Sequence, residues 1–385
     1  EPFTLMCLNL SDGAALWQAN HDYTDIAPPE QLADMAQKQA EYDDLLRQIA
    51  INGRDRGLVR KQLQDNPDNE DLKARMRELN EAFKQLQARL APYLDIWYVR
   101  PQTHPYNGYA SATPVSDGQH VWAIFGHGIA CCYDLQGNRI WARPLQKPTN
   151  SYGHSASPVL ADGKLIMHVL TMQALDPLTG ELIWEAKIPP YWGTPIVVQI
   201  QGTPVIITPN GFAVNATNGA ILAQGLGNCN YAAPVVHEGV VYFADDTQDW
   251  RAVRLPDTLD PFTVQEVWHA RPKKDRYYSS PVVHDGIIYG VTRSQFLSAL
   301  DINTGQVLYE QNLALGKGEC YSSITLAGDK LLLLCDNGNA VVFVPGPSYQ
   351  ELARSMLDTC RSCPVFQGDR MYLRTYSRMY CIGAP

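Results

Sequence analysis

Two pairs of cysteines are spaced closely enough for metal binding or disulfide chemistry. Cys360 and Cys363 have the CxxC spacing of zinc and redox sites, but the sequence has no second CxxC and no CxxCH motif for haem attachment. Cys131 and Cys132 are adjacent within an apolar strand pattern, where neighbouring side chains point to opposite faces. We therefore expect the nine cysteines to be mostly buried free thiols that pack as small apolar groups.

The other ionisable candidates lie in predicted turns. Asp245 and Asp246 are adjacent carboxylates that could hold a cation, but the sequence shows no further ligand beside them. His237 and His284 recur at the same place in the turns VVHEG and VVHDG, which is typical of solvated turn residues. We therefore predict no metal site.

These candidates belong to phrases that recur about every forty residues. In YSSPVVHDGIIYG (278–290) and YAAPVVHEGVVYF (231–243), small residues precede Pro-Val, an acidic residue with Gly, and a β-rich run. A second phrase, as in LDPLTGELIW (175–184) and LDINTGQVLY (300–309), has an apolar residue, Asp, a turn ending in Gly and an apolar strand. Because Asp can bond the turn backbone and Gly adopts positive φ, each phrase predicts a β-hairpin.

Two hairpins in each repeat give four short antiparallel strands, which predicts an all-β fold, a β-propeller of four-stranded blades. The first copy of the second phrase, LNLSDGAALW (8–17), has no Pro-Val hairpin before it, and the last strand, near 379–382, has no strand after it. We therefore expect an eight-bladed ring that an upstream segment missing from this sequence would complete. The alternative is a seven-bladed ring in which residues 14–17 close the last blade. The Pro-Val anchors are Pro114, Pro158, Pro195, Pro234, Pro281, Ile324 and Pro364.

One position in the repeat samples the mouth of the channel once in every blade. The innermost strands of a propeller line its channel, so the residue three before each anchor lies where those strands begin. Four of these residues are aromatic, and flat faces with polar tips suit a planar ligand, a sugar or a peptide, although such rings can also simply plug a channel. The small residues that follow them are expected to be structural. The predicted ligand-binding set is Trp192, Tyr231, Tyr278, Tyr321 and Arg361, with His154 and Tyr277 one place earlier in their blades.

The phrases SSPVVHDGIIYG and LDPLTGELIW resemble the pyrroloquinoline quinone (PQQ)-like propeller repeat. That repeat occurs in quinoprotein alcohol dehydrogenases and in a non-enzymatic lipoprotein of the outer-membrane assembly machinery. The resemblance covers residues 4–20 and the chain from about residue 109 onward. It implies the fold strongly and the function weakly, because many members of the family bind no quinone.

A quinone-dependent dehydrogenase of this family would need a Ca²⁺ or similar ion on the quinone, a general-base Asp, and Arg or Lys near the quinone oxygens. Trp192 and Arg361 could fill two of its places, but the mouth positions hold no pair of carboxylate and amide side chains, Glu319 and Asn230 being the nearest. The adjacent cysteines that flank the cofactor in some of these enzymes lie here within a strand. We therefore expect no catalytic residue and no cofactor, and keep PQQ with calcium as the alternative.

Residues 30–91 differ from the rest because they are rich in charge and contain two apolar seams at heptad spacing, over residues 32–49 and 72–90. They predict an antiparallel coiled-coil hairpin, with a break or kink near Gly53 and Gly57. The predicted organisation is a partial first blade (1–27), the helical insertion (28–95) and seven further blades (96–385). The hairpin is either a rigid decoration or an arm that docks a partner.

Composition limits the function further. The net charge is −9 without a basic stripe, which argues against nucleic-acid binding, and no apolar run is long enough to span a membrane. The chain opens EPFTLMCLNL, with no basic region or cleavage site of a signal peptide. We expect a bacterial, non-catalytic scaffold that binds a protein or a small planar or sugar ligand, with a PQQ-dependent dehydrogenase of an alcohol or sugar as the alternative. Its expected location is periplasmic or secreted, with the leader absent from this sequence, although a cytoplasmic location stays open.

Overall fold

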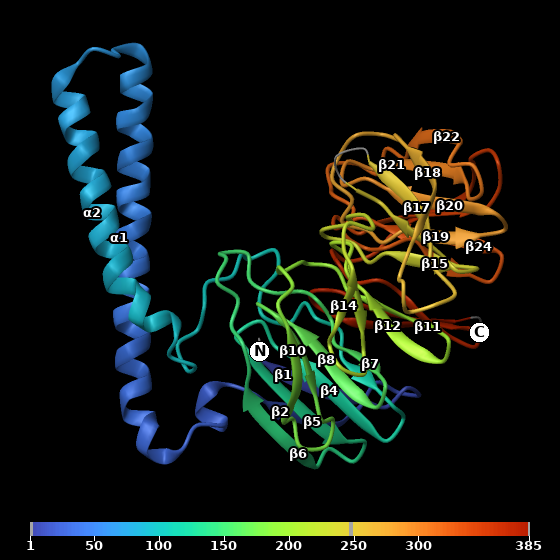
Figure 1. Cartoon of the computed structure of the whole chain (residues 1–385), viewed down its shortest axis with the longest axis horizontal. Helices are drawn as coiled ribbons and strands as arrows, with labels where there is room; N and C mark the ends of the chain where they lie inside the picture. Colours follow the sequence, from blue (N-terminus) through green and yellow to red (C-terminus); the bar gives the residue numbers. More distant parts are fainter. Residues whose placement is uncertain (1–2, 246–248, 384–385) are drawn as a thin grey trace.

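The structure, a computed structural model of the chain, describes residues 3–245 and 249–383 and forms a seven-bladed β-propeller with a helical hairpin beside it (Figure 1). Six blades are four-stranded antiparallel sheets and the seventh has three strands. The first three blades are β3 (Val115–Ser116), β4 (His120–Ile124), β5 (Ile129–Asp134) and β6 (Arg139–Pro144); β7 (Val159–Ala161), β8 (Lys164–His168), β9 (Met172–Leu175) and β10 (Leu182–Ala186); and β11 (Ile196–Ile200), β12 (Thr203–Ile207), β13 (Ala213–Asn215) and β14 (Ile221–Ala223).

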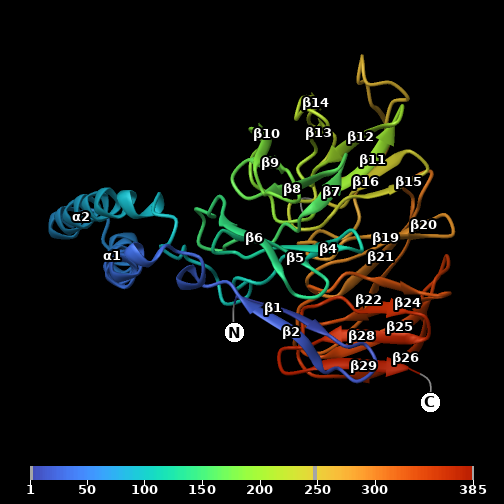
Figure 2. The same cartoon turned by 90° about the horizontal axis from the view of Figure 1, so that it is seen from below.

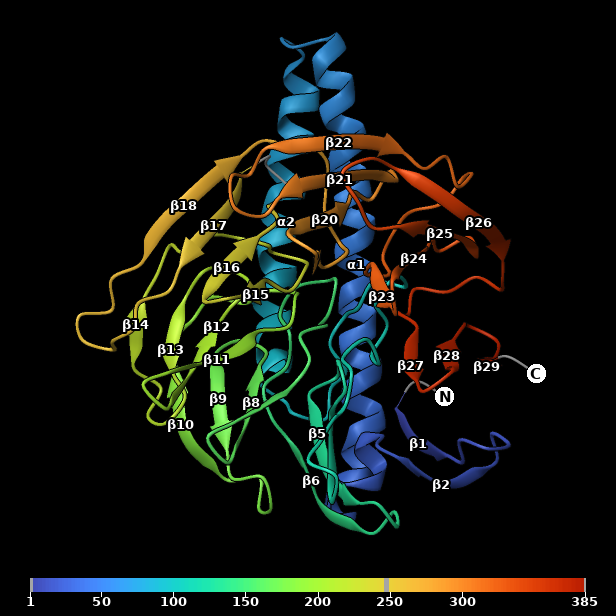
Figure 3. The same ribbon diagram turned by 90° about the vertical axis from the view of Figure 1, so that its right-hand side faces the viewer.

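The remaining blades continue around the same axis, as Figure 3 shows. They are β15 (Val235–His237), β16 (Val240–Phe243), β17 (Trp250–Arg254) and β18 (Gln265–Ala270); β19 (Val282–His284), β20 (Ile287–Val291), β21 (Phe296–Asp301) and β22 (Val307–Asn312); β23 (Thr325–Ala327), β24 (Lys330–Leu334), β25 (Asn339–Val344) and β26 (Gln350–Met356); and β27 (Val365–Gln367), β28 (Arg370–Arg374) and β29 (Met379–Gly383).

The first hairpin of the chain, β1 (Thr4–Leu8) and β2 (Ala15–Asn20), forms a sheet of its own. It lies between the seventh blade and the first (Figures 2 and 3). The ring therefore has seven blades, the smaller of the two predicted sizes. The expected closure of the last blade by residues 14–17 is wrong, because β2 pairs with β1 and not with β29.

The apolar cores lie between neighbouring blades, because each sheet is covered on both faces. In one of them Ile166 and Trp184 of the second blade pack against Ile206 and Val214 of the third. At several interblade interfaces, a tryptophan of the fourth strand packs over a turn glycine of the next blade. For Trp184, a Cβ added at Gly219 would lie 2.7 Å from the indole, and the indole N–H donates to the Ala216 carbonyl at 3.0 Å.

The helical hairpin consists of α1 (Leu32–Asp65) and α2 (Glu70–Leu94), preceded by the short 3₁₀ turns η1 (Tyr23–Asp25) and η2 (Pro29–Gln31). It stands to one side of the propeller in Figure 1. The Asn69 side chain caps α2 by accepting from the Leu72 N–H at 3.1 Å. No helix in the described part of the chain is long and apolar enough to cross a membrane.

The predicted break near Gly53 and Gly57 is wrong, because α1 continues through both residues. A helix-interior glycine costs only about 1 kcal/mol relative to alanine. Packing against α2 offsets that cost: Asn52 is buried and its amide donates to the Leu79 carbonyl at 2.9 Å, while the Arg56 guanidinium lies 4.5 Å from the Phe83 ring centroid.

Candidate functional site

The loops that enter the innermost strands bring the predicted tyrosines into direct contact. Tyr278 and Tyr321 stack nearly parallel, with ring centroids 4.9 Å apart and planes inclined by 8°. Tyr231 meets Tyr278 edge to face at 5.0 Å. These three residues come from three successive blades and occupy the same position of the repeat.

Arg361 extends this row by stacking between two rings. Its guanidinium carbon lies 4.4 Å from the Tyr321 ring centroid and 4.2 Å from that of Tyr106. It also donates to the Tyr106 carbonyl at 2.8 Å and lies 3.5 Å from the Asp336 carboxylate. We call Tyr231, Tyr278, Tyr321, Arg361 and Tyr106 together the mouth arc.

Tyr106 was missed by the sequence argument because it lies outside the repeat. It comes from the loop between α2 and β3, in THPYNGY, whose clustered aromatic residues are the signal that could have found it. Nearby in the loop, Asn107 donates to the carbonyls of Tyr152 at 2.9 Å and His154 at 3.0 Å in the second blade. Since Tyr106 contacts the sixth and seventh blades, this loop crosses the mouth.

Trp192 lies on the other side of that loop. Its indole meets Tyr152 edge to face at 6.3 Å, and the Tyr152 ring stacks on His104 at 5.1 Å. The Trp192 backbone is held by its N–H, which donates to the Asn230 carbonyl at 3.0 Å. The loop thus connects Trp192 with the mouth arc through aromatic contacts.

Two predicted site residues have buried side chains and do not line the mouth. Tyr277 is 1% exposed, packs against Trp250 and donates its hydroxyl to the Lys273 carbonyl at 2.7 Å. His154 is 5% exposed. The physical reason is alternation: side chains next to each other on an extended segment point to opposite sides, so the neighbour of a mouth residue faces the interblade core.

Charged groups near the mouth are bound to other protein groups. The Glu319 carboxylate accepts from the Tyr321 hydroxyl at 2.6 Å and lies 3.7 Å from the Arg293 guanidinium. Burial, followed by this hydrogen bond, raises the pKa of Tyr321 above its ordinary value. Tyr321 therefore acts as a hydrogen-bond donor near neutral pH and not as an acid.

The small residues behind the mouth form an interblade belt, as expected of structural positions. A backbone N–H of one blade donates to the hydroxyl of the next, for example Ser280 to Ser323 at 2.9 Å. Cys363 occupies the same slot and accepts from the Ser323 N–H through its sulfur at 3.1 Å. The belt also includes Thr113 to Ser157, Ser157 to Thr194 and Ala233 to Ser280.

The paired cysteines and carboxylates form no disulfide and no metal cluster in the part of the chain that the structure describes. The nine cysteines are free thiols; Cys131 and Cys132 are buried in β5. Asp245 accepts from the Asn228 amide at 3.1 Å, and Asp246 lies outside the described residues. Within residues 3–245 and 249–383, no three His, Cys, Asp or Glu side chains are grouped closely enough to hold a metal ion.

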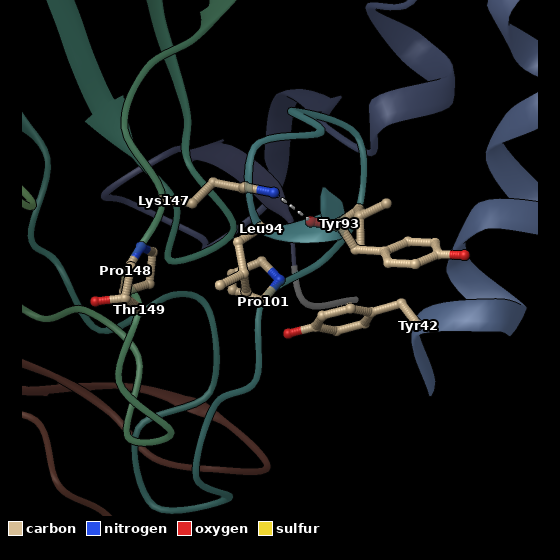
Figure 4. A pocket seen from close by; sticks show the side chains of 8 residues that line it. Tyr42, Tyr93, Leu94, Pro101, Lys147, Pro148 and Thr149 are labelled. Atoms are coloured by element: carbon tan, nitrogen blue, oxygen red, sulfur yellow. Dashed lines mark hydrogen bonds between the residues drawn. The ribbon is translucent and has the colours of Figure 1, made fainter. Parts of the chain in front are cut away.

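A small cavity of about 20 Å³ lies where the helical hairpin joins the propeller (Figure 4). Lys147 reaches across this junction and donates to the carbonyls of Ile96 at 2.5 Å and Val99 at 3.1 Å. Burial lowers the pKa of Lys147 to about 8. The cavity holds no more than about one water molecule, so it is too small for a ligand. The Lys147 hydrogen bonds here connect the helical hairpin to the propeller.

Three buried histidines should make stability depend on pH. Burial lowers the pKa of His127, His154 and His168 to about 4 each, and the Nδ1 atoms of His127 and His168 have no partner. Between pH 6.5 and 4 the unfolded chain therefore binds more protons than the folded one, so the free energy of unfolding falls as pH falls.

From pH 7 to pH 5 we expect a loss of about 2 kcal/mol for each of these histidines. In urea unfolding, His168→Gln should lose about 2 kcal/mol less unfolding free energy between pH 7 and pH 5 than the wild-type chain loses. Tyr191→Phe is the matched control, because Tyr191 packs on His168 at 4.2 Å and its hydroxyl has no partner. An unchanged pH dependence in His168→Gln would contradict the assignment.

The comparisons with known proteins agree on the fold. The sequence profile of the family described as outer membrane protein assembly factor BamB matches residues 105–258 and 171–319, which together exceed half of the chain. No curated protein sequence matches the chain at the significance required.

Solved structures of propellers superpose on the chain at low sequence identity. BamB from Moraxella catarrhalis has a TM-score of 0.54 and 15% identity, covering 70% of this chain and 84% of that one. The C-terminal WD40 domain of Sif2 has a TM-score of 0.54 and 11% identity, with 71% and 81% covered. The computationally designed Ika8 protein has a TM-score of 0.50 and 13% identity, with 71% and 82% covered. At these identities the superpositions support the propeller fold alone.

Proposed function

The chain belongs to the PQQ-like propeller family of the outer membrane protein assembly factor BamB, and from this premise we propose that it is a non-catalytic protein-binding scaffold in outer-membrane protein assembly. The proposal includes a location outside the cytoplasm, in the periplasm or at the outer membrane. The observation that carries it is the mouth arc, where five aromatic or guanidinium planes are already packed in fixed geometry.

A row of aromatic and guanidinium planes that is already packed in place is better suited to binding a protein segment than to catalysing a reaction. Tyrosine and arginine are enriched among the residues that dominate protein interfaces, and tyrosine offers a large contact area at low conformational-entropy cost. We propose that an extended segment of a partner protein lies along the mouth arc, with its backbone bonding to the tyrosine hydroxyls. A small planar or sugar ligand would use the same faces, and its binding in place of a protein is an outcome of the test.

The proposal includes no cofactor. Arg361 already bonds the Tyr106 carbonyl and pairs with Asp336, and Glu319 already pairs with Tyr321 and Arg293. A quinone with its ion would have to take these groups from their protein partners. We therefore derive no redox step through the mouth.

The test is co-purification of the tagged full-length chain from its source organism, with outer-membrane assembly proteins quantified by mass spectrometry. Tyr278→Ala with Tyr321→Ala should reduce their recovery, because loss of hot-spot residues costs about 2 kcal/mol or more, roughly a 30-fold loss of affinity. Leu178→Ala, which truncates an exposed apolar side chain in a turn outside the arc, is the control. Recovery that is unchanged in the double variant, or the absence of assembly proteins from the wild-type sample, would contradict the proposal.

The helical hairpin offers a second docking surface, and the same experiment distinguishes it. Ile51 and Leu58, seven residues apart on one face of α1, are 43% and 64% exposed. If Ile51→Ser with Leu58→Ser abolishes recovery while the double variant of the mouth does not, the arm binds the partner. We expect the opposite result, because most of the apolar surface of the hairpin is used between its own helices.

A further inference from the structure

Two buried cysteines that the sequence spacing did not single out meet in the sixth blade. Cys320 precedes β23 and Cys335 directly follows β24, and both are 0% exposed. Their Sγ atoms lie 2.8 Å apart. Unbonded carbon atoms pack about 3.5–4.0 Å apart and sulfur is larger, so this separation lies between an ordinary contact and the disulfide bond length of about 2.05 Å. The fold has thus already brought the two sulfurs together.

Backbone hydrogen bonds beside the two cysteines hold them opposite each other. The Asp336 N–H donates to the Glu319 carbonyl at 2.9 Å, and the Glu319 N–H donates to the Asp336 carboxylate at 2.8 Å. Cys320 follows Glu319 and Cys335 precedes Asp336, so the cysteines form the next pair along these antiparallel segments. Residues opposite each other on such segments have Cα atoms about 4.5–5.5 Å apart, within the span of about 4.4–6.8 Å that disulfides bridge. A disulfide here needs little movement of the backbone.

The surroundings of the pair are apolar. Both cysteines belong to the core between the fifth and sixth blades, together with Val291, Leu297 and Phe343. A thiol is a weak hydrogen-bond donor, and the hydrogen bond that these two thiols make is the one between them. Removing their two hydrogens therefore leaves no buried polar group without its partner.

Burial determines when the pair can be oxidised. The hydrogen bond to Cys335, followed by burial, raises the pKa of the Cys320 thiol above its ordinary value. Since the thiolate is the form that attacks a disulfide, and neither side chain is accessible, the folded chain reacts slowly. Oxidation therefore takes place while the chain folds, before the sixth blade packs against the fifth.

We propose that Cys320 and Cys335 form a structural disulfide in the sixth blade, beside the mouth arc. The bond joins the segment that carries Tyr321, which directly follows Cys320, to the segment that carries Asp336. The Asp336 carboxylate lies 3.5 Å from the Arg361 guanidinium, which in turn lies over the Tyr321 ring. One covalent link therefore holds both segments on which the contact of Tyr321 with Arg361 depends.

The oxidant is the disulfide of a thiol–disulfide oxidoreductase, a class of enzyme that works in oxidising compartments outside the cytoplasm. The thiolate of one cysteine attacks a sulfur of that disulfide, which forms a mixed disulfide and releases one thiolate of the enzyme. The thiolate of the other cysteine then attacks the sulfur of the first, which forms the new S–S bond and releases the second thiolate of the enzyme. Two electrons and the two thiol protons pass from the chain to the enzyme, which leaves as a dithiol.

The test compares the full chain exported to the periplasm of a bacterial host, by an added leader peptide, with the same chain produced in the cytoplasm of that host. Both samples are alkylated with iodoacetamide in denaturant and cut with trypsin without reduction. Cleavage after Lys317, Lys330 and Arg354 places the two cysteines on separate peptides, residues 318–330 and 331–354. Mass spectrometry should find these peptides joined in the exported chain and separately alkylated in the cytoplasmic chain.

Cys360 is the rival partner in this experiment. It is 2% exposed, and its N–H donates to the Asp336 carbonyl at 3.3 Å. Trypsin releases it on a third peptide, residues 355–361, so its cross-links have their own masses. A cross-link of Cys320 or Cys335 to Cys360, or alkylation of both cysteines in the exported chain, would overturn the proposal.

Thermal unfolding measures whether the bond restrains the chain. Closing a loop of roughly 15 residues should raise the unfolding midpoint of the exported chain by about 5 °C over that of the cytoplasmic chain. In Cys320→Ala the two preparations should unfold at the same temperature, whereas Cys360→Ala, which truncates another buried thiol, should keep the difference. Equal midpoints of the two wild-type preparations, or a difference that survives in Cys320→Ala, would contradict the proposal.

The disulfide shares with the proposed function only the location outside the cytoplasm. The added leader supplies that location in the test, so the outcome does not depend on where the chain resides in its source organism. A missing cross-link would leave the co-purification of assembly proteins through the mouth arc untouched, and a failed co-purification would leave the cross-link untouched. The two proposals can therefore fail separately.

Discussion

Replacing Trp268 with alanine should lower the free energy of unfolding by about 3–5 kcal/mol. The indole is 7% exposed and lies in the core between the fourth and fifth blades, where it covers Gly305. Its N–H donates to the Ile302 carbonyl at 2.8 Å. Truncation leaves a cavity at an interface that the surrounding strands cannot close, because both sheets are fixed by their own hydrogen bonds.

The measurement is denaturant unfolding followed by far-ultraviolet circular dichroism. Trp268→Phe is the matched variant: it keeps an aromatic ring over Gly305 and loses the N–H, so it should cost less, with the hydrogen bond itself contributing about 1 kcal/mol. If alanine and phenylalanine destabilise equally, the covering of the glycine contributes nothing and this interpretation is wrong.

Gly193→Ala should have the second largest effect, a loss of about 3 kcal/mol. A Cβ at Gly193 would lie 2.0 Å from the Ala232 carbonyl oxygen and 2.5 Å from its carbon, so it meets backbone that has no rotamer by which to withdraw. The Gly193 N–H also donates to the Asn230 carbonyl at 3.2 Å. The third and fourth blades would have to separate at the mouth.

Thermal unfolding of Gly193→Ala and of Gly346→Ala provides the comparison. Gly346 has no atom within 4 Å of an added Cβ and does not have a positive φ. Its substitution should be close to neutral and should control for the loss of glycine flexibility in the unfolded chain. Comparable destabilisation by both substitutions would show that crowding at the mouth is not the cause.

The proposed role of the mouth arc depends on Tyr278, Tyr321 and Arg361. Propellers commonly bind partners by loops held on a rigid ring, and the rigidity here comes from the interblade cores.

The sequence by itself determined the blades and the register of the mouth. The turns depend on local chemistry: Asp176 accepts from the backbone N–H groups of Leu178 and Thr179, and Gly180 takes positive φ. Because such hairpins repeat, one position in the repeat returns to the same height in every blade, and Tyr278 and Tyr321, which share that position, lie in contact.

Only the tertiary structure decided the features that depend on contacts between distant segments. Tyr106 contacts Arg361, although the two residues are far apart in the sequence. Packing of Asn52 against α2 keeps α1 continuous past its glycines. The docking of Trp17 on Gly137, with β1–β2 as a separate sheet, likewise depends on which surfaces meet. Local patterns specify hairpins, but the closure of a ring is set by the fit of surfaces that no short stretch of sequence contains.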